Sequence, residues 1–146
     1  MEDFDFSDGG SLTWNEPPPT QIVKAVPYTV DHNSTRQLHE GTKNATLSWQ
    51  FDLTELKFAS LAIWFNGTSI AGVQSSGSGP EPGFENQFGI DWIPNQTFVR
   101  LIIFNVTTEE KGTFTCRVLA LRKMAGFASF EFKSKVQVDV VGKSKF

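Results

Sequence analysis

The segment Glu109–Cys116 reads EEKGTFTC. Three of its residues, Gly112, Phe114 and Cys116, stand at alternate positions, and alternation is the period of a β-strand. Cys116 is the only cysteine of the chain, so no disulfide can form within it. The side chain that packs opposite Cys116 therefore bears both on how the core is held and on where the protein works.

Two longer segments alternate between apolar and polar residues, as expected for strands that are buried on one face. In the segment 45–54 the inward side is expected to carry Ala45, Leu47, Trp49, Phe51 and Leu53. In the segment 128–140 it is expected to carry Ala128, Phe130, Phe132, Ser134, Val136, Val138 and Val140.

The rest of the chain also consists of short strand patterns separated by turns. Residues 20–31 predict an irregular edge strand interrupted at Pro27, because proline cannot pair inside a sheet. Residues 59–65 are apolar on both faces, and Asn66-Gly67 predicts a two-residue hairpin turn after them. Residues 75–83 predict a flexible loop, and strands are expected over 84–93, 97–106 and 112–121. Seven to nine strands without helices indicate an all-β sandwich or barrel.

Length and composition fit one domain with two tails. The chain has 146 residues, of which 39% are hydrophobic and 13% aromatic. We expect a flexible, acidic and proline-rich tail over 1–19, a domain over 20–141, and a tail or linker over 142–146. The net charge of −3 argues against a nucleic-acid partner. No apolar run reaches membrane-spanning length, so membrane attachment would require a segment outside this chain.

Five of the seven asparagines lie in N-x-S/T sequons, where about one such match is expected by chance. The pattern favours passage through the secretory pathway and an extracellular or cell-surface location. Asn-x-Thr also suits turns and strand ends, which leaves a structural explanation open. The sequons begin at Asn33, Asn44, Asn66, Asn95 and Asn105.

The opening stretch resembles the D-x-G-x-Y-x-C signature around strand F of immunoglobulin domains. Upstream, LIIFNV is similar to the family's strand E, and WFNGTSIA to its short C–C′ hairpin. The resemblance covers residues 20–141 and implies a two-sheet antiparallel sandwich of the V-like or intermediate type. The chain is also similar to immunoglobulin-like modules of invertebrate surface proteins, cnidarian ones especially. The implied core signature is Trp49, Trp64, Leu101, Ile103, Glu110, Gly112, Phe114 and Cys116.

The sequence departs from the family at three places. Phe114 replaces the tyrosine that braces the corner before strand F, so that hydrogen bond is lost. Glu110 replaces aspartate, and Gln87 stands where a strand D arginine is common, so a Gln–Glu hydrogen bond is expected in place of an ion pair. Trp49 falls where strand B would carry its first cysteine.

Trp49 is expected to substitute for the missing disulfide by packing over Trp64 and the Cys116 sulfur. It lies 15 residues before Trp64 and 67 before Cys116, which fits the family's spacing. A disulfide closing such a loop would contribute about 4 kcal/mol, and a buried indole about 4–6 kcal/mol. Cys116 would then be a buried apolar side chain. A reactive thiol or an intermolecular disulfide is the alternative.

Catalysis receives little support from the sequence, and no cofactor is expected. His32 and His39 lack the spacing of metal ligands, and no nucleophile elbow or phosphate-binding glycine motif is present. We therefore expect a chain that is not an enzyme.

A sheet face supports binding instead. If Trp64 faces the core, Leu61, Ile63 and Phe65 face outward beside the strand F residues. Such an apolar face around an arginine is typical of protein recognition, unless the N-terminal segment or a neighbouring domain covers it. The predicted contacts on the front sheet are Leu61, Ile63, Phe65, Arg117, Leu119 and Leu121, and those in the following loop are Arg122, Lys123 and Met124.

The sequence leaves two functions open. One is an extracellular recognition or adhesion module that binds a protein, homophilically or heterophilically, or forms a weak homodimer. The other is an intracellular structural domain of the muscle-filament or cytoskeletal kind, since that class also resembles this chain in lacking the bridge.

Overall fold

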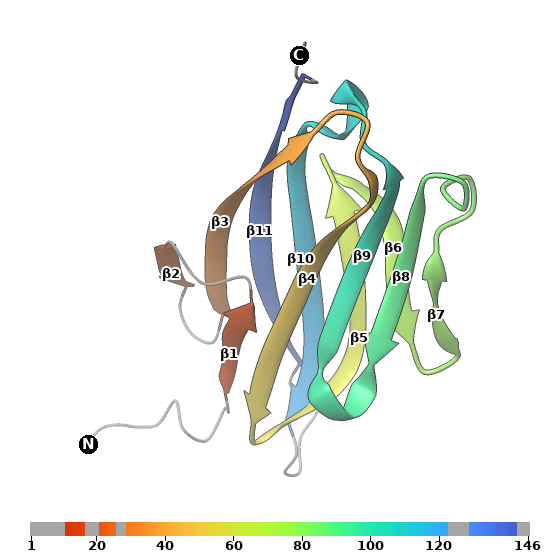
Figure 1. The fold of residues 1–146 in the computed structure, drawn as a ribbon. Helices are drawn as coiled ribbons and strands as arrows, with labels where there is room; N and C mark the ends of the chain where they lie inside the picture. The colour runs from red at the N-terminus through yellow and green to blue at the C-terminus, as the bar shows by residue number, and fades with distance from the viewer. Residues whose placement is uncertain (1–10, 17–20, 26–28, 123–128, 143–146) are drawn as a thin grey trace.

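The computed structural model describes residues 11–16, 21–25, 29–122 and 129–142, which form strands joined by turns and two short 3-10 helices (Figure 1). No helix in these residues has the length and apolarity needed to cross a membrane. The elements are β1 (Ser11–Glu16), β2 (Gln21–Ala25), β3 (Thr29–His39), β4 (Lys43–Thr54), β5 (Leu56–Phe65), β6 (Thr68–Gln74), β7 (Gly77–Pro80), β8 (Phe88–Ile93), η2 (Pro94–Gln96), β9 (Phe98–Asn105), η3 (Thr108–Glu110), β10 (Gly112–Arg122) and β11 (Ser129–Val141).

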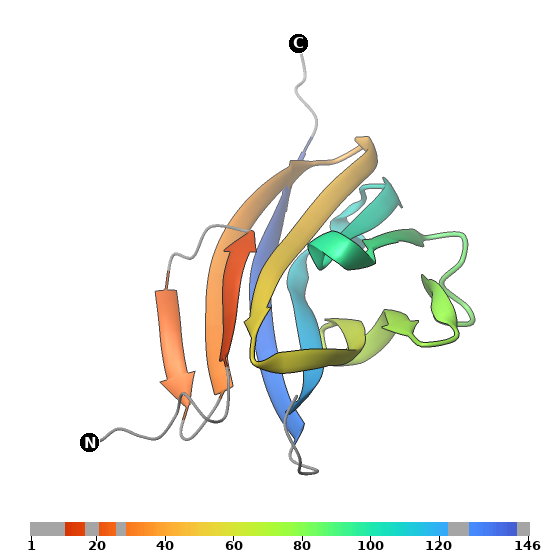
Figure 2. The ribbon, with the colours of Figure 1, turned by 90° about the horizontal axis from the view of Figure 1, so that it is seen from below.

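The strands form two sheets packed face to face (Figure 2). The four-stranded sheet has the order β1-β4-β9-β8, and the seven-stranded sheet has the order β2-β3-β11-β10-β5-β6-β7. Their strand pairs are antiparallel, except that β3 runs parallel to β11. The predicted all-β sandwich is confirmed.

The two alternating segments became the central strands β4 and β11. In β4 the side chains of Ala45, Leu47, Trp49 and Phe51 are buried, as predicted. In β11 the buried positions are Phe130, Phe132, Ser134, Val136 and Val138, while Val140 is partly buried. The predicted hairpin turn is also present: Asn66 and Gly67 join β5 to β6 with φ angles of +49° and +88°, the left-handed conformation that such turns require.

The sandwich begins earlier than residue 20, so the predicted flexible tail over 1–19 is wrong at residues 11–16. Residues 11–16 form β1, which pairs with β4 and places Leu12 and Trp14 in the core. The Trp14 ring meets Phe51 edge to face at 5.4 Å. The breakers around this segment hid a strand of only 6 residues, whose pairing comes from a partner far along the chain.

Two other predicted boundaries also changed. The single edge strand expected over 20–31 is two strands, β2 and β3, with Pro27 outside the described residues. The loop expected over 75–83 contains β7, which pairs with β6.

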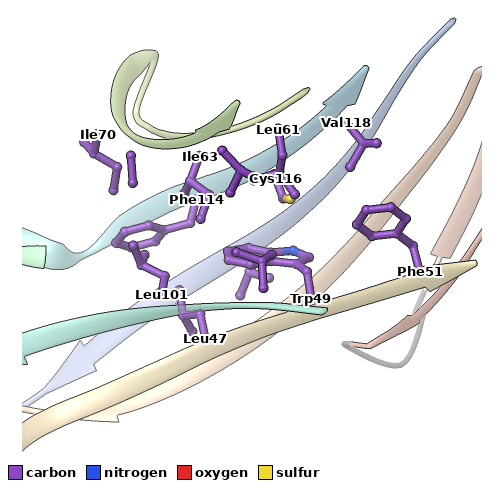
Figure 3. Packing of buried hydrophobic residues seen from close by; sticks show 14 of the residues in the cluster. Leu47, Trp49, Phe51, Leu61, Ile63, Ile70, Leu101, Phe114, Cys116 and Val118 are labelled. Carbon is purple, nitrogen blue, oxygen red and sulfur yellow. The ribbon is translucent and has the colours of Figure 1, made fainter. Parts of the chain in front are cut away.

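Trp49 connects the two sheets at the centre of the core. Its indole Nε1 donates a hydrogen bond of 3.1 Å to Oγ of Ser134, and both side chains are fully buried. Ser134 on β11 is the register partner of Cys116 on β10. Figure 3 shows the sulfur of Cys116 pointing toward the Trp49 ring. The indole therefore occupies the place of a bridge between the sheets, and it adds a polar contact that the sequence did not reveal.

The corner before β10 is held by the buried carboxylate of Glu110. Oε2 of Glu110 accepts a hydrogen bond of 3.0 Å from Nε2 of Gln87, which confirms the expected Gln–Glu contact. Oε1 accepts from the backbone N–H of Thr107 at 2.6 Å and from the Thr107 hydroxyl at 3.0 Å. Three neutral donors thus satisfy this buried carboxylate.

The Trp49–Ser134 contact predicts a strong energetic coupling. Trp49→Phe should lower the free energy of unfolding by about 2–4 kcal/mol, because it removes buried area and the N–H donor. Ser134→Ala should cost about 1–3 kcal/mol, because it leaves the indole N–H without this acceptor.

Urea unfolding of both variants and of the double variant measures the coupling, which should reach about 1 kcal/mol. Ser48→Ala, on the outer side of the same strand, is the control and should change stability by no more than about 0.5 kcal/mol. Strict additivity of the two core substitutions would contradict the contact.

Burial also predicts an unreactive thiol. Cys116 has no exposed surface, and burial raises the pKa of its thiol well above the ordinary value. Native protein should therefore react with an aromatic disulfide reagent only at its unfolding rate, whereas protein in denaturant should react at once. Rapid labelling of the native protein would show that the ring does not cover the sulfur.

Candidate protein-binding surface

The structure reverses the predicted orientation of β5. Ile63 pairs with Cys116 and is 0% exposed, and Leu61 is 2% exposed, so both belong to the core. Phe65 also turns inward and stacks on Phe114 with ring centroids 4.5 Å apart. Trp64 faces outward. The prediction that Leu61, Ile63 and Phe65 are surface contacts is therefore wrong. The prediction that Trp64 lies in the core and packs against Trp49 is wrong as well.

The error has a simple physical cause. Residues 59–65 are apolar on both sides, so alternation alone does not choose the buried face. The spacing of Trp49 and Trp64 favours the wrong face, and a shift of one residue moves every side chain of a strand to the other face. Pairing with β10 settles the matter, because Cys116 is buried and its partner on β5 is Ile63.

We call the outer side of β5, β10 and β11 the front face. At its centre lies Arg117, whose guanidinium carbon is 5.0 Å from the centre of the Trp64 ring. Nε of Arg117 donates to Oε2 of Glu131 at 2.7 Å, and Nη2 contacts the same oxygen. Oε1 of Glu131 lies 3.8 Å from Nζ of Lys133. The sequence placed Glu131 and Lys133 outward, but it did not reveal their link to Arg117.

Two leucines extend the front face along β10. Leu119 is 38% exposed and Leu121 is 39% exposed, which is high for large apolar side chains. Their neighbours on β5 are Ser60 and Lys57, neither of which covers them with a large apolar group. The predicted outward orientation of Arg117, Leu119 and Leu121 is what the structure shows. Arginine and tryptophan beside exposed aliphatic groups are a composition typical of protein interfaces.

The loop residues contribute less than expected. Arg122 is the register partner of the buried Leu56 and its guanidinium carbon lies 6.0 Å from the Phe130 ring, so it covers the end of the core. It therefore does not belong to the front face. Lys123 and Met124 lie outside the described residues.

The sequon asparagines lie mostly on the surface. Asn44, Asn66, Asn95 and Asn105 have exposed side chains, whereas Asn33 on β3 is half-buried. The start of β4, the β5–β6 turn and the end of β9 lie together at the upper end of Figure 1, and the η2 turn lies at the lower end. Oδ1 of Asn66 accepts from the backbone N–H of Thr113 at 3.0 Å, so this sequon also has a structural use.

Among the described residues, no group of three or more histidine, cysteine, aspartate or glutamate side chains is placed to hold a metal ion. A shallow hollow of about 330 Å³ lies at the β6–β7 edge, lined by glycine, serine and other polar residues, with Glu81 at its margin. It lacks the apolar walls typical of small-molecule sites.

Comparison with known proteins supports the fold and no more. No protein-family model matches the sequence, nor does any curated protein. Among solved structures, one of murine CRIg is similar, with a TM-score of 0.57 and 12% sequence identity over 72% of this chain and 92% of that chain. At this identity the similarity shows the architecture alone, which is an immunoglobulin-like β-sandwich.

The corrected orientation predicts opposite outcomes for two glutamate substitutions. Ile63→Glu places a carboxylate in the core and should cost about 4 kcal/mol or more, enough to unfold a domain of ordinary stability. Leu119→Glu on the front face should change the free energy of unfolding by no more than about 1 kcal/mol.

Circular dichroism and thermal melting of the two variants measure the difference. If Ile63→Glu folded as well as the parent protein while Leu119→Glu unfolded, the face assignment of β5 and β10 would be wrong.

Proposed function

We propose that this chain is an extracellular recognition module, not an enzyme, which binds a protein partner through the front face. The observation that carries the proposal is the pair of exposed leucines, Leu119 and Leu121, beside the Arg117–Trp64 pair on an open sheet surface. Apolar groups of this size in water favour a partner that covers them.

The rigidity of the front face supports the same function. Arg117 is held by two N–H contacts to one carboxylate oxygen of Glu131 and by the Trp64 ring, so little conformational entropy of its side chain remains to be lost on binding. All three strands of the face are anchored in the core by buried alternate residues, such as Ile63, Val118 and Phe132. A preorganised surface of this kind suits recognition better than catalysis.

The extracellular location is supported by the sequons. Four of the five acceptor asparagines have exposed side chains, and none of those four lies on the front face. Glycans at these positions would therefore leave the proposed contact surface open. The free, buried Cys116 does not separate this location from the alternative, an intracellular structural domain, because a core without a disulfide tolerates either compartment.

The test is expression through a eukaryotic secretory pathway behind an added signal peptide. The protein should be secreted folded and lose mass on treatment with an N-glycosidase, because its acceptor side chains are accessible. The variant with Asn44, Asn66, Asn95 and Asn105 changed to glutamine is the control and should lose little mass. A product that is retained in the cell or carries no glycan would contradict the extracellular assignment.

The secreted protein, displayed as a multimer, should bind the surface of cells from its source organism. Leu119→Glu and Trp64→Ala should each reduce this binding about tenfold or more, as expected for central interface residues. Ser48→Glu on the opposite sheet is the matched control and should bind like the parent protein. Absence of binding, or equal binding by all variants, would contradict recognition through the front face.

A further inference from the structure

The charges on the front face differ from those of the whole chain. The outward positions of β5, β10 and β11 carry four cations, Lys57, Arg117, Lys133 and Lys135, against two carboxylates, Glu131 and Asp139. Four cations and two anions give this face a net charge of +2, whereas the chain as a whole carries −3. The positive charge is therefore concentrated on the side that also exposes the leucines.

Part of this charge is not neutralised within the described residues. Glu131 serves both Arg117 and Lys133, so one carboxylate is shared by two cations. Lys57 and Lys135 are exposed, and neither forms an ion pair with another described residue. Farther along β11, Asp139 lies 3.5 Å from Lys111, so the two cancel. The charge that remains available lies on the same face as the leucines, with Lys57 beside Leu121 and Lys135 farther along the face beside Thr115.

We propose that the partner of the front face is an acidic protein segment that also carries apolar side chains. The inference rests on the proposed function and adds the chemistry of its partner. Acidic side chains would meet Lys57, Lys133 and Lys135, while apolar side chains would cover Leu119 and Leu121. Charge complementarity of this kind speeds association and selects the partner.

The same features disfavour two other occupants. Two copies of the chain meeting front to front would bring one surface of charge +2 against another, and like charges in an interface are costly. A sulfated polysaccharide would satisfy the lysines but would leave the leucines in water. A protein segment with both kinds of side chain satisfies all of them.

Selection from a random library of 15-residue peptides displayed on phage, with the intact chain as bait, tests the proposal. The selected peptides should be enriched in aspartate and glutamate together with leucine, isoleucine or aromatic residues. Their synthetic forms should bind about tenfold more weakly when sodium chloride rises from 50 to 500 mM, because salt screens exposed charges.

Two front-face variants separate the charge from the apolar surface. The triple variant Lys57→Gln, Lys133→Gln and Lys135→Gln should weaken peptide binding tenfold or more, and so should Leu119→Ser. Lys43→Gln, which lies on the four-stranded sheet, is the matched control and should leave binding unchanged.

Each contrary result has a distinct meaning. If binding were lost with Leu119→Ser but kept in the triple lysine variant, the acidic partner would be overturned while recognition through the front face would stand. If both variants bound like the parent protein, both proposals would fail. Heparin binding that does not depend on Leu119, or a dimer of the parent protein in sedimentation, would also overturn the acidic protein partner.

Discussion

The hydrogen bond from the Trp49 indole to Ser134 is the contact on which the arrangement of the two sheets depends. It joins β4 to β11 across the middle of the core at 3.1 Å, beside the unpaired Cys116. Burial of the indole offers stabilisation comparable to that of a bridge, about 4–6 kcal/mol as an upper bound. The hydrogen bond adds direction, because an indole N–H that lost its acceptor in the core would be costly. The sheets are therefore held at a fixed offset without a covalent link.

This offset determines which side chains fill the remaining space. Cys116 lies beside Ser134 in the register of β10 and β11, and Ile63 lies beside Cys116 in the register of β10 and β5. Once Ser134 points toward Trp49, the inward positions of all three strands follow from the alternation of side chains. Glu110 fixes the beginning of β10 by its contacts to Gln87 and Thr107. A polar contact at the centre and another at the corner thus specify one register.

The parts of the fold that the sequence predicted correctly are those where a pattern had only one solution. β4 and β11 alternate apolar and polar residues, so their buried faces followed directly, and the Gln87–Glu110 contact followed from two substitutions that compensate each other. β5 has apolar residues on both sides, so its buried face is decided by pairing with β10. The two strands are far apart in the sequence: the contact between Asn66, just after β5, and Thr113 on β10 spans 47 residues. β1 depends in the same way on β4. Long-range pairing of this kind leaves no local pattern to detect.

The register of β5 also explains why the front face has its particular chemistry. With Ile63 inward, Trp64 must face outward. There the centre of its ring lies 5.0 Å from the guanidinium carbon of Arg117, so the arginine has an aromatic partner as well as Glu131. Glu131 is shared between Arg117 and Lys133, so the face keeps an excess of positive charge. If Trp64 had filled the core, Arg117 would have lost its aromatic partner and the apolar centre of the face would have been Ile63. The composition of the surface is thus a consequence of how the core beneath it is packed, and substitutions of outward residues can change the partner without disturbing the contact between Trp49 and Ser134.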